Sequence, residues 1–145
     1  MRRALALLAC VAAAIALLGP RPTPRRVVML PPGVVELHAE MTVAPFTELR
    51  GAPSGSTLRA APDFRGRALV VATGAGVVLR DFSIDGARSL LEKPSGLPPY
   101  DRPFRDFTPD NGVLADRAHG LRIANLRIRE VAGFAILVAR SNDVS

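Results

Sequence analysis

The sequence has no tryptophan and a single cysteine, Cys10, which lies in an apolar N-terminal segment. Removal of that segment leaves a chain without a thiol. Such a chain forms no disulfide, offers no cysteine ligand to zinc and has no cysteine nucleophile. The sequence therefore excludes disulfide-stapled folds and cysteine-dependent catalysis for the mature body.

The body of the chain also has little net charge, although the whole sequence carries +6. Five of the 19 basic residues lie within residues 1–26, a stretch without an acid, which leaves 14 basic against 13 acidic side chains in residues 27–145. A balanced body lacks the basic surface of a nucleic-acid-binding protein, so we predict no nucleic-acid partner. Hydrophobic residues make up 48% of the 145 residues, which excludes wholesale disorder and suits one domain.

Residues 1–19 have the pattern of an export signal. Two arginines precede an apolar run over residues 4–19, and Ala14-Ile15-Ala16 favours cleavage after Ala16. The run has 16 residues, fewer than the ~20 that span a bilayer comfortably. The alternatives are an uncleaved membrane anchor and lipidation at Cys10. Each predicts an exported body (periplasmic, secreted or at the cell surface) that contacts a membrane only through residues 4–19 if the signal is uncleaved. Residues 20–26, with three prolines, are a predicted linker.

A repeat organises the rest of the chain. Residues 69–77, 113–121 and 136–144 align without gaps, each as a short apolar strand, a polar turn and the start of another strand. The first two segments are 44 residues apart and the last two are 23 apart, and an insertion after Ile84 accounts for the difference. Residues 77–84 and 121–128 continue the alignment.

Apolar and polar residues alternate within these units, which predicts strands. Asp81 and Asn125 occupy the same point of the repeat, where we predict a sharp corner and a ladder of side-chain hydrogen bonds. No helical stripe is visible in the body, so stacked parallel strands fit better than a sheet with crossover helices. The side chains predicted to point into one continuous core are those of Leu79, Ile84, Ile123, Ile128 and Val138.

The pattern resembles the right-handed parallel β-helix of the pectin-lyase-like superfamily. The stretches that carry the resemblance are Leu30–Leu37, Thr47–Gly51, Ser56–Arg59, Val77–Gly86 and Gly120–Asn125. The resemblance implies an all-β solenoid of about three coils over residues 27–145, preceded by a hydrophobic signal helix. Residues 27–44 are expected to form a capping strand or a partial turn over the N-terminal end. The strands expected in the three coils are 47–50, 56–59 and 68–71, then 77–80, 82–84 and 113–115, then 121–123, 126–128 and 135–138.

Ser145 aligns with Arg122 and Val78, which both lie inside predicted strands. Solenoids need a cap at each end, and the last residues resemble none. We therefore expect a fragment that is truncated at its C-terminus. The alternative is a short complete protein whose open end is buried by self-association.

The insertion, residues 87–111, holds five prolines and three aromatic residues and is a candidate wall of a binding cleft. Its aromatic rings suit sugar rings, and its arginines suit the carboxylates of sugar acids. Arg122, Arg127 and Arg129 alternate outward on the third coil and would line a groove for an anionic polymer. The alternatives are a surface loop packed by its own aromatics and a solvated strand face. The candidate substrate-binding residues are Tyr100, Arg102, Arg105 and Arg122.

Two aspartates bracket the insertion and are the catalytic candidates, Asp85 and Asp110. A carboxylate pair serves acid–base hydrolysis or holds calcium, yet Asp85-Gly86 and Asp110-Asn111-Gly112 are turn signals first. We predict no metal site. His119 superficially resembles a hydrolase histidine but aligns with turn positions, which predicts an exposed turn histidine, and His38 has no partner pattern.

The resemblance implies the N-terminal part of an exported carbohydrate-active protein that acts on an acidic polysaccharide as a lyase, hydrolase or epimerase. A lyase of this kind would use calcium and an arginine or lysine base, and no other cofactor is visible. Catalytic groups in these folds usually come from middle coils that this chain does not reach, so we expect the chain by itself to be inactive. The alternative is a non-catalytic β-helix for adhesion or scaffolding.

Overall fold

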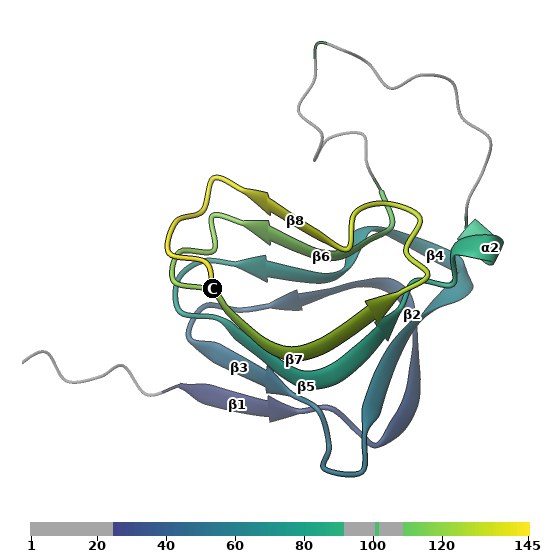
Figure 1. Ribbon diagram of the computed structural model, residues 1–145, viewed down its shortest axis with the longest axis horizontal. Helices are drawn as coiled ribbons and strands as arrows, with labels where there is room; N and C mark the ends of the chain where they lie inside the picture. Colours follow the sequence, from purple (N-terminus) through teal and green to yellow (C-terminus); the bar gives the residue numbers. More distant parts are fainter. Residues whose placement is uncertain (1–24, 92–100, 102–108) are drawn as a thin grey trace, which may run out of the picture.

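The computed structural model describes residues 25–91, 101 and 109–145. Strands dominate this part of the chain (Figure 1), and the only helix within it is α2 (Arg88–Leu91). The described fold is therefore all-β, as the alternation of apolar residues predicts. The strands are β1 (Arg26–Met29), β2 (Gly33–Val43), β3 (Thr47–Arg50), β4 (Ser56–Thr73), β5 (Val78–Asp85), β6 (Asn111–Asp116), β7 (Arg122–Arg129) and β8 (Ile136–Ala139).

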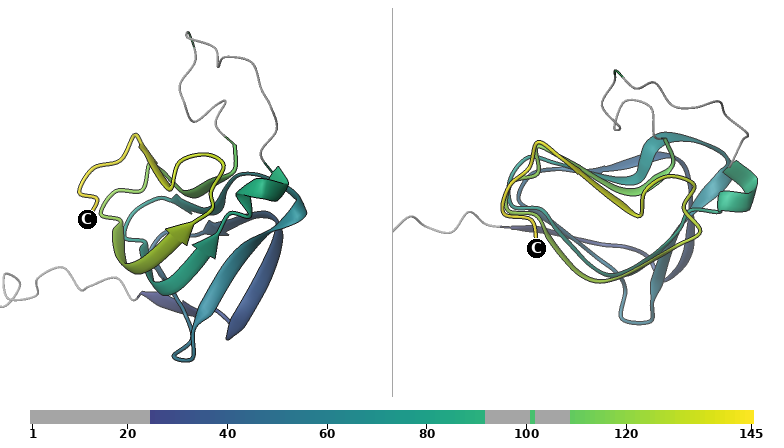
Figure 2. Two further views of the ribbon diagram at one scale, coloured as in Figure 1. Left: turned by 45° about the vertical axis from the view of Figure 1, so that its right-hand side comes forward. Right: turned by 45° about the horizontal axis from the view of Figure 1, so that its top comes forward.

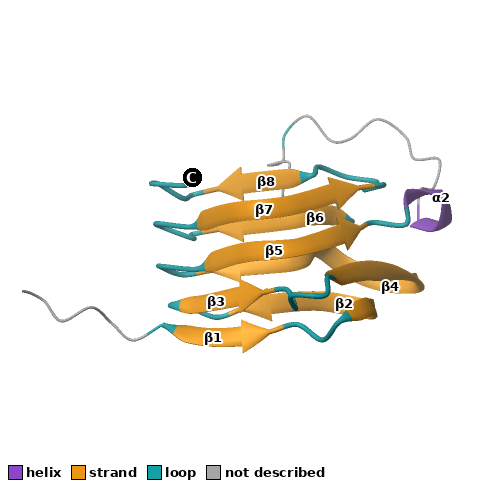
Figure 3. Ribbon diagram, turned by 60° about the horizontal axis from the view of Figure 1, so that its bottom comes forward, coloured by secondary structure: helices purple, strands orange, loops and turns teal. Residues whose placement is uncertain are grey.

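Every strand pairing is parallel, which requires the chain to cross over between neighbours. β1, β3, β5 and β7 lie side by side in one layer, and β2, β4, β6 and β8 lie in a second layer (Figures 2 and 3). β4 also pairs with β5, so the two layers belong to one continuous sheet. Strands that are adjacent in sequence therefore alternate between layers, and strands two apart become neighbours.

The strand register confirms much of the predicted repeat. Val78 on β5 pairs with Arg122 on β7, 44 residues later, and Val113 on β6 pairs with Ile136 on β8, 23 residues later. Ser145 exchanges backbone hydrogen bonds with Leu121 and Ile123, at 3.0 and 2.7 Å, which places it opposite Arg122 as the alignment predicts. Residues that are one repeat apart in the sequence therefore lie side by side on neighbouring strands.

One predicted alignment is wrong by a residue. Val113 pairs with Val70 and not with Leu69, so β4 and β6 are offset by 43 residues, one fewer than β5 and β7. The cause is the turn that follows each strand: residues 74–77 link β4 to β5, whereas residues 117–121 link β6 to β7. The turn after β6 is one residue longer than the turn after β4. The offset is therefore 43 residues between β4 and β6 and 44 residues between β5 and β7.

The N-terminal strands also differ from expectation. Residues 27–44 cover the N-terminal end with more than one capping strand or a partial turn, because β1 pairs with β3 and β2 with β4 in the same parallel arrangement as the later strands. β4 spans both of the separate strands expected at 56–59 and 68–71. Between them its pairing with β2 shifts register twice, which accommodates the additional residues and buries Phe64 at 2% exposure.

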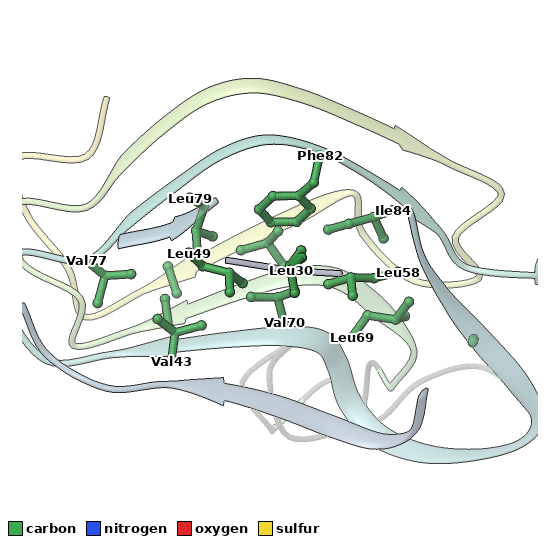
Figure 4. Packing of buried hydrophobic residues seen from close by; sticks show 14 of the residues in the cluster. Leu30, Val43, Leu49, Leu58, Leu69, Val70, Val77, Leu79, Phe82 and Ile84 are labelled. Carbon is green, nitrogen blue, oxygen red and sulfur yellow. The ribbon is translucent and has the colours of Figure 1, made fainter. Parts of the chain in front are cut away.

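The core lies between the two layers. In Figure 4, Leu79, Phe82 and Ile84 from β5 point toward Val43 and Val70 from the opposite layer. The predicted core is confirmed at Leu79 and Ile84, which are fully buried, and at Ile123 and Ile128, which pack against the same cluster and are partly buried. Val138 is 45% exposed although its register partner Ala115 is buried. Within the described residues no strand pairs with the outer edge of β8, so Val138 is covered on one side only.

Candidate functional site

The candidate site lies on the outward face of β5 and β7. These two strands pair over their whole length, from Val78 opposite Arg122 to Asp85 opposite Arg129. Because side chains alternate along a strand, the residues between the core positions face outward. Ser83 on β5 and its register partner Arg127 on β7 are two such residues, so a hydroxyl and a guanidinium stand on neighbouring strands, about 5 Å apart at the backbone.

A sharp corner interrupts both strands at the predicted position. Asp81 and Asn125 have left-handed backbone conformations, with φ of 64° and 53°, which Asp and Asn tolerate better than most residues. The Nδ2 amide of Asn125 donates a hydrogen bond of 3.0 Å to Oδ1 of Asp81, and Nε of Arg80 donates one of 2.7 Å to Oδ2. The predicted side-chain ladder is thus present.

Glycine is required at the corner below Asp81. The amide of Gly51 donates to the carbonyl of Arg80 at 3.1 Å. A Cβ atom at position 51 would lie 2.0 Å from the carbonyl oxygen of Asp81, far inside van der Waals contact. The close approach brings the turn between β3 and β4 against β5.

The corner keeps one carboxylate ionised. The hydrogen bond from Asn125 lowers the pKa of Asp81 below its ordinary value of 3.8, and the hydrogen bond and charge of Arg80 lower it further. Asp81 in turn raises the pKa of Arg80 through the same hydrogen bond. Asp81 is therefore negative at every physiological pH, with its charge offset by Arg80.

A shallow groove of about 470 Å³ runs beside this corner. The turn between β3 and β4 contributes one side, and the outward surface of β5 and β7 contributes the rest. Phe82 is one of the lining residues, but its side chain is buried and its ring points into the core (Figure 4). The residues that line the groove are Gly55, Ser56, Asp81, Phe82, Ser83, Asn125, Leu126 and Arg127.

Two arginines on β7 have no ion-pair partner within the described residues. Arg122 and Arg127 are exposed and face outward, as the sequence predicts. Arg127 lines the groove, whereas Arg122 lies on the same strand outside it. Arg129 differs, because its Nη2 donates to Oδ2 of Asp85 at 3.0 Å. The free positive charge of this face is therefore carried by Arg122 and Arg127.

Asp85, a catalytic candidate from the sequence, is buried and engaged through both carboxylate oxygens. One accepts the bond from Arg129, and the other accepts a bond of 3.1 Å from the backbone amide of Ala87. The second contact is a turn in which an aspartate caps its own backbone two residues on. These contacts give Asp85 a structural role, because they hold the backbone at the start of the insertion in place.

Asp110 lies at the other end of the insertion and also adopts a left-handed conformation, with φ of 59°. Its amide donates to the carbonyl of Gly66 at 3.3 Å, and its carbonyl accepts from Gly133 at 3.2 Å. Gly86, after Asp85, donates to the carbonyl of Arg129 at 3.0 Å. Both ends of the insertion are thus fastened to the chain around residues 129–133, through different partners.

Several candidates from the sequence lie outside the described residues. The insertion is described only at residues 87–91, 101 and 109–111. The signal segment and most of the linker lie outside as well. In the part of the chain that the structure covers, no cluster of His, Cys, Asp and Glu could hold a metal ion, and no helix is long and apolar enough to cross a membrane. The candidate binding residues outside the described part are Tyr100, Arg102 and Arg105.

The two histidines do not line the groove. His119 is exposed on a turn and its Nδ1 is hydrogen-bonded to Oδ1 of Asn142, its counterpart 23 residues later. This matches the predicted turn histidine. Nδ1 of His38 lies 2.6 Å from Oδ1 of Asp63, and this hydrogen bond lowers the pKa of Asp63.

Sequence reasoning missed two features of the site. Ser83 was detectable, because the 44-residue spacing already places it beside Arg127. The contribution of Gly55 and Ser56 was not detectable, because it depends on how the turn between β3 and β4 is placed against β5. No protein family, curated protein or solved structure matches this chain.

Proposed function

We propose that the described strands form a right-handed parallel β-helix of the kind found in the pectin-lyase-like superfamily. Three observations support this fold. All pairings are parallel, the stacked strands β5 and β7 are offset by 44 residues and β6 and β8 by 23, and left-handed corners recur at equivalent positions such as Asp81 and Asn125. Stacked side-chain hydrogen bonds at such corners are typical of repeats in which each unit contacts its neighbours.

We further propose that the chain is the N-terminal part of an exported carbohydrate-active protein, and that the outward face of β5 and β7 binds an acidic polysaccharide. The observation that carries the proposal is the exposure of Arg122 and Arg127 on one strand face without an ion-pair partner in the described part of the chain. Guanidinium groups bind carboxylates through paired, charge-assisted hydrogen bonds. A repeated anion along a polymer engages several such groups at once.

The geometry favours binding over catalysis at this face. Asp81 is held by Arg80 and Asn125, and Asp85 by Arg129 and the amide of Ala87. Neither carboxylate is free to exchange a proton with a substrate in the way that acid–base hydrolysis requires. A catalytic centre with calcium and a basic residue would belong to other coils. The second candidate function is a non-catalytic adhesion or scaffold module. The same observation supports it, because both carboxylates are already hydrogen-bonded within the protein.

The test is a binding measurement with purified full-length chain against polygalacturonate, alginate and uncharged dextran. We expect the two acidic polymers to bind, dextran to bind little, and the affinity to fall strongly at about 0.5 M salt. The double variant Arg122→Ala/Arg127→Ala should bind about tenfold more weakly. Arg65→Ala removes an exposed arginine from β4 and is the matched control, expected to bind like the parent. Equal binding to dextran, or no loss in the double variant, would overturn the proposal.

A further inference from the structure

The groove beside the corner contains a negative and a positive side chain, and they differ in whether a neighbouring side chain already offsets their charge. Asp81 is already bonded to Arg80 and Asn125. Arg127 has no ion-pair partner in the described part of the chain. The charge that remains available to a ligand in the groove is therefore positive and is located at one end, on β7.

The remaining polar groups of the groove suit hydroxyls. Ser83 stands opposite Arg127 in the strand register and offers a hydroxyl that donates and accepts. The ionised carboxylate of Asp81 retains lone pairs for a ligand O–H group. The same negative charge disfavours a second anion beside it. A ligand in this groove would thus place its acid near Arg127 and its neutral hydroxyls near Asp81.

The size and floor of the groove limit the ligand further. A volume of about 470 Å³ lies in the lower part of the range that small-molecule sites occupy. Because the ring of Phe82 is buried in the core, no aromatic face of the lining residues is available for stacking. Recognition at this groove therefore depends on hydrogen bonds and on the single free charge.

We propose that this groove is a subsite for one carboxylate-bearing sugar unit, with the carboxylate on Arg127 and ring hydroxyls on Ser83 and Asp81. The proposal rests on the proposed function of the β5–β7 face and adds to it a defined position and orientation for one unit of the polymer. Arg122, outside the groove, contributes to polymer binding but not to this subsite.

The experiment compares monosaccharides that differ only in their acid. Galacturonate and galactose are titrated into isotope-labelled full-length chain, and amide shifts are followed by nuclear magnetic resonance. We expect galacturonate to shift the resonances of Gly55, Ser83 and Arg127, and galactose to bind about tenfold more weakly. Arg127→Ala should abolish the galacturonate shifts and Ser83→Ala should weaken them. Arg65→Ala, which removes an exposed arginine of β4 that does not line the groove, is the matched control and should leave them unchanged.

The outcomes separate the subsite from the polymer function. Polymer binding that depends on Arg122 and Arg127, together with galacturonate shifts outside the groove or none at all, would overturn the subsite and leave the polymer function standing. Galacturonate shifts in the groove without polymer binding would support the subsite and overturn the polymer function. Equal binding of galactose would show that the groove does not read the carboxylate, which also overturns the subsite.

Discussion

Asn125 donates its side-chain amide to the carboxylate of Asp81, 44 residues earlier in the chain, at 3.0 Å. The two residues share a left-handed backbone conformation and the same position on neighbouring strands. The contact therefore links the bend of β5 to the bend of β7. It also fixes the charge at one end of the groove, since it is the largest cause of the lowered pKa of Asp81.

The first prediction concerns the ionisation of Asp81. Its pKa, followed by the side-chain carboxyl resonance in a pH titration, should lie below 3.8 in the parent chain. Asn125→Gly removes the donor while preserving access to the left-handed region, and should raise the pKa toward 3.8. Because the folded pKa is depressed, ionised Asp81 stabilises the fold above pH 3.8, and this contribution is lost as the pH falls through the folded pKa.

Asn125→Ala is the matched variant for the backbone. It removes the same hydrogen bond and also places a Cβ in the left-handed region, so it should be less stable than Asn125→Gly by about 1 kcal/mol. The pKa of Asp81 should rise equally in the two variants. A pKa that does not move in either variant would show that Asn125 does not hold the charge of Asp81.

The second prediction concerns Asn111, a fully buried amide that connects three levels of the stack. Its Nδ2 donates to the carbonyl of Arg67 at 2.7 Å, and its Oδ1 accepts from the amide of Phe134 at 2.7 Å. Asn111→Ala leaves buried backbone groups without these partners and should lower the free energy of unfolding by about 2–3 kcal/mol. Chemical denaturation measures this loss.

Asn142 provides the control for this prediction. It is exposed and bonds His119 at the turn between stacked strands. Its replacement by alanine should cost less than about 1 kcal/mol, since water satisfies the groups that remain. Similar losses at positions 111 and 142 would contradict a special role for the buried amide.

The third prediction compares the stability effects of two positions that the sequence places in the same core. Leu79→Ala removes a fully buried side chain and should destabilise by about 2–5 kcal/mol. Val138→Ala, at a side chain that is 45% exposed, should cost less than about 1 kcal/mol. Thermal or chemical unfolding of the two variants tests this difference in burial. A larger loss of stability in Val138→Ala than in Leu79→Ala would contradict it.

The fourth prediction is that this chain by itself does not degrade acidic polysaccharides. Both candidate acids are held by their surroundings, Asp85 through its carboxylate and Asp110 through its backbone. Incubation with polygalacturonate or alginate and calcium should give neither unsaturated ends nor new reducing ends. Turnover that disappears in Asp85→Ala or Asp110→Ala would place the active site at the base of the insertion and refute the prediction.

The sequence predicted those features of the site that depend on the repeat. The 44-residue spacing predicted the contact of Asp81 with Asn125, because stacked parallel strands turn a constant offset into a lateral contact. The same spacing was sufficient to place Ser83 beside Arg127, although Ser83 was not among the predicted site residues. The spacing also places Asp85 beside Arg129. It could not predict that the Asp85 carboxylate is buried and held by Arg129 and the amide of Ala87, because Asp85-Gly86 is compatible with both a turn and a catalytic role. Nor could it predict the one-residue shift of Val113 onto Val70, since the lengths of two turns had to be weighed together.

The sequence by itself determined the all-β character, the parallel stacking order and the inward and outward faces, since alternation and repeat spacing are local properties of the chain. Only the tertiary structure decided which outward residues meet in one groove. That outcome depends on the close approach of Gly51 to Asp81, which brings the turn between β3 and β4 against β5. Such an approach is settled by excluded volume between segments 30 residues apart, and no pattern along the chain encodes it.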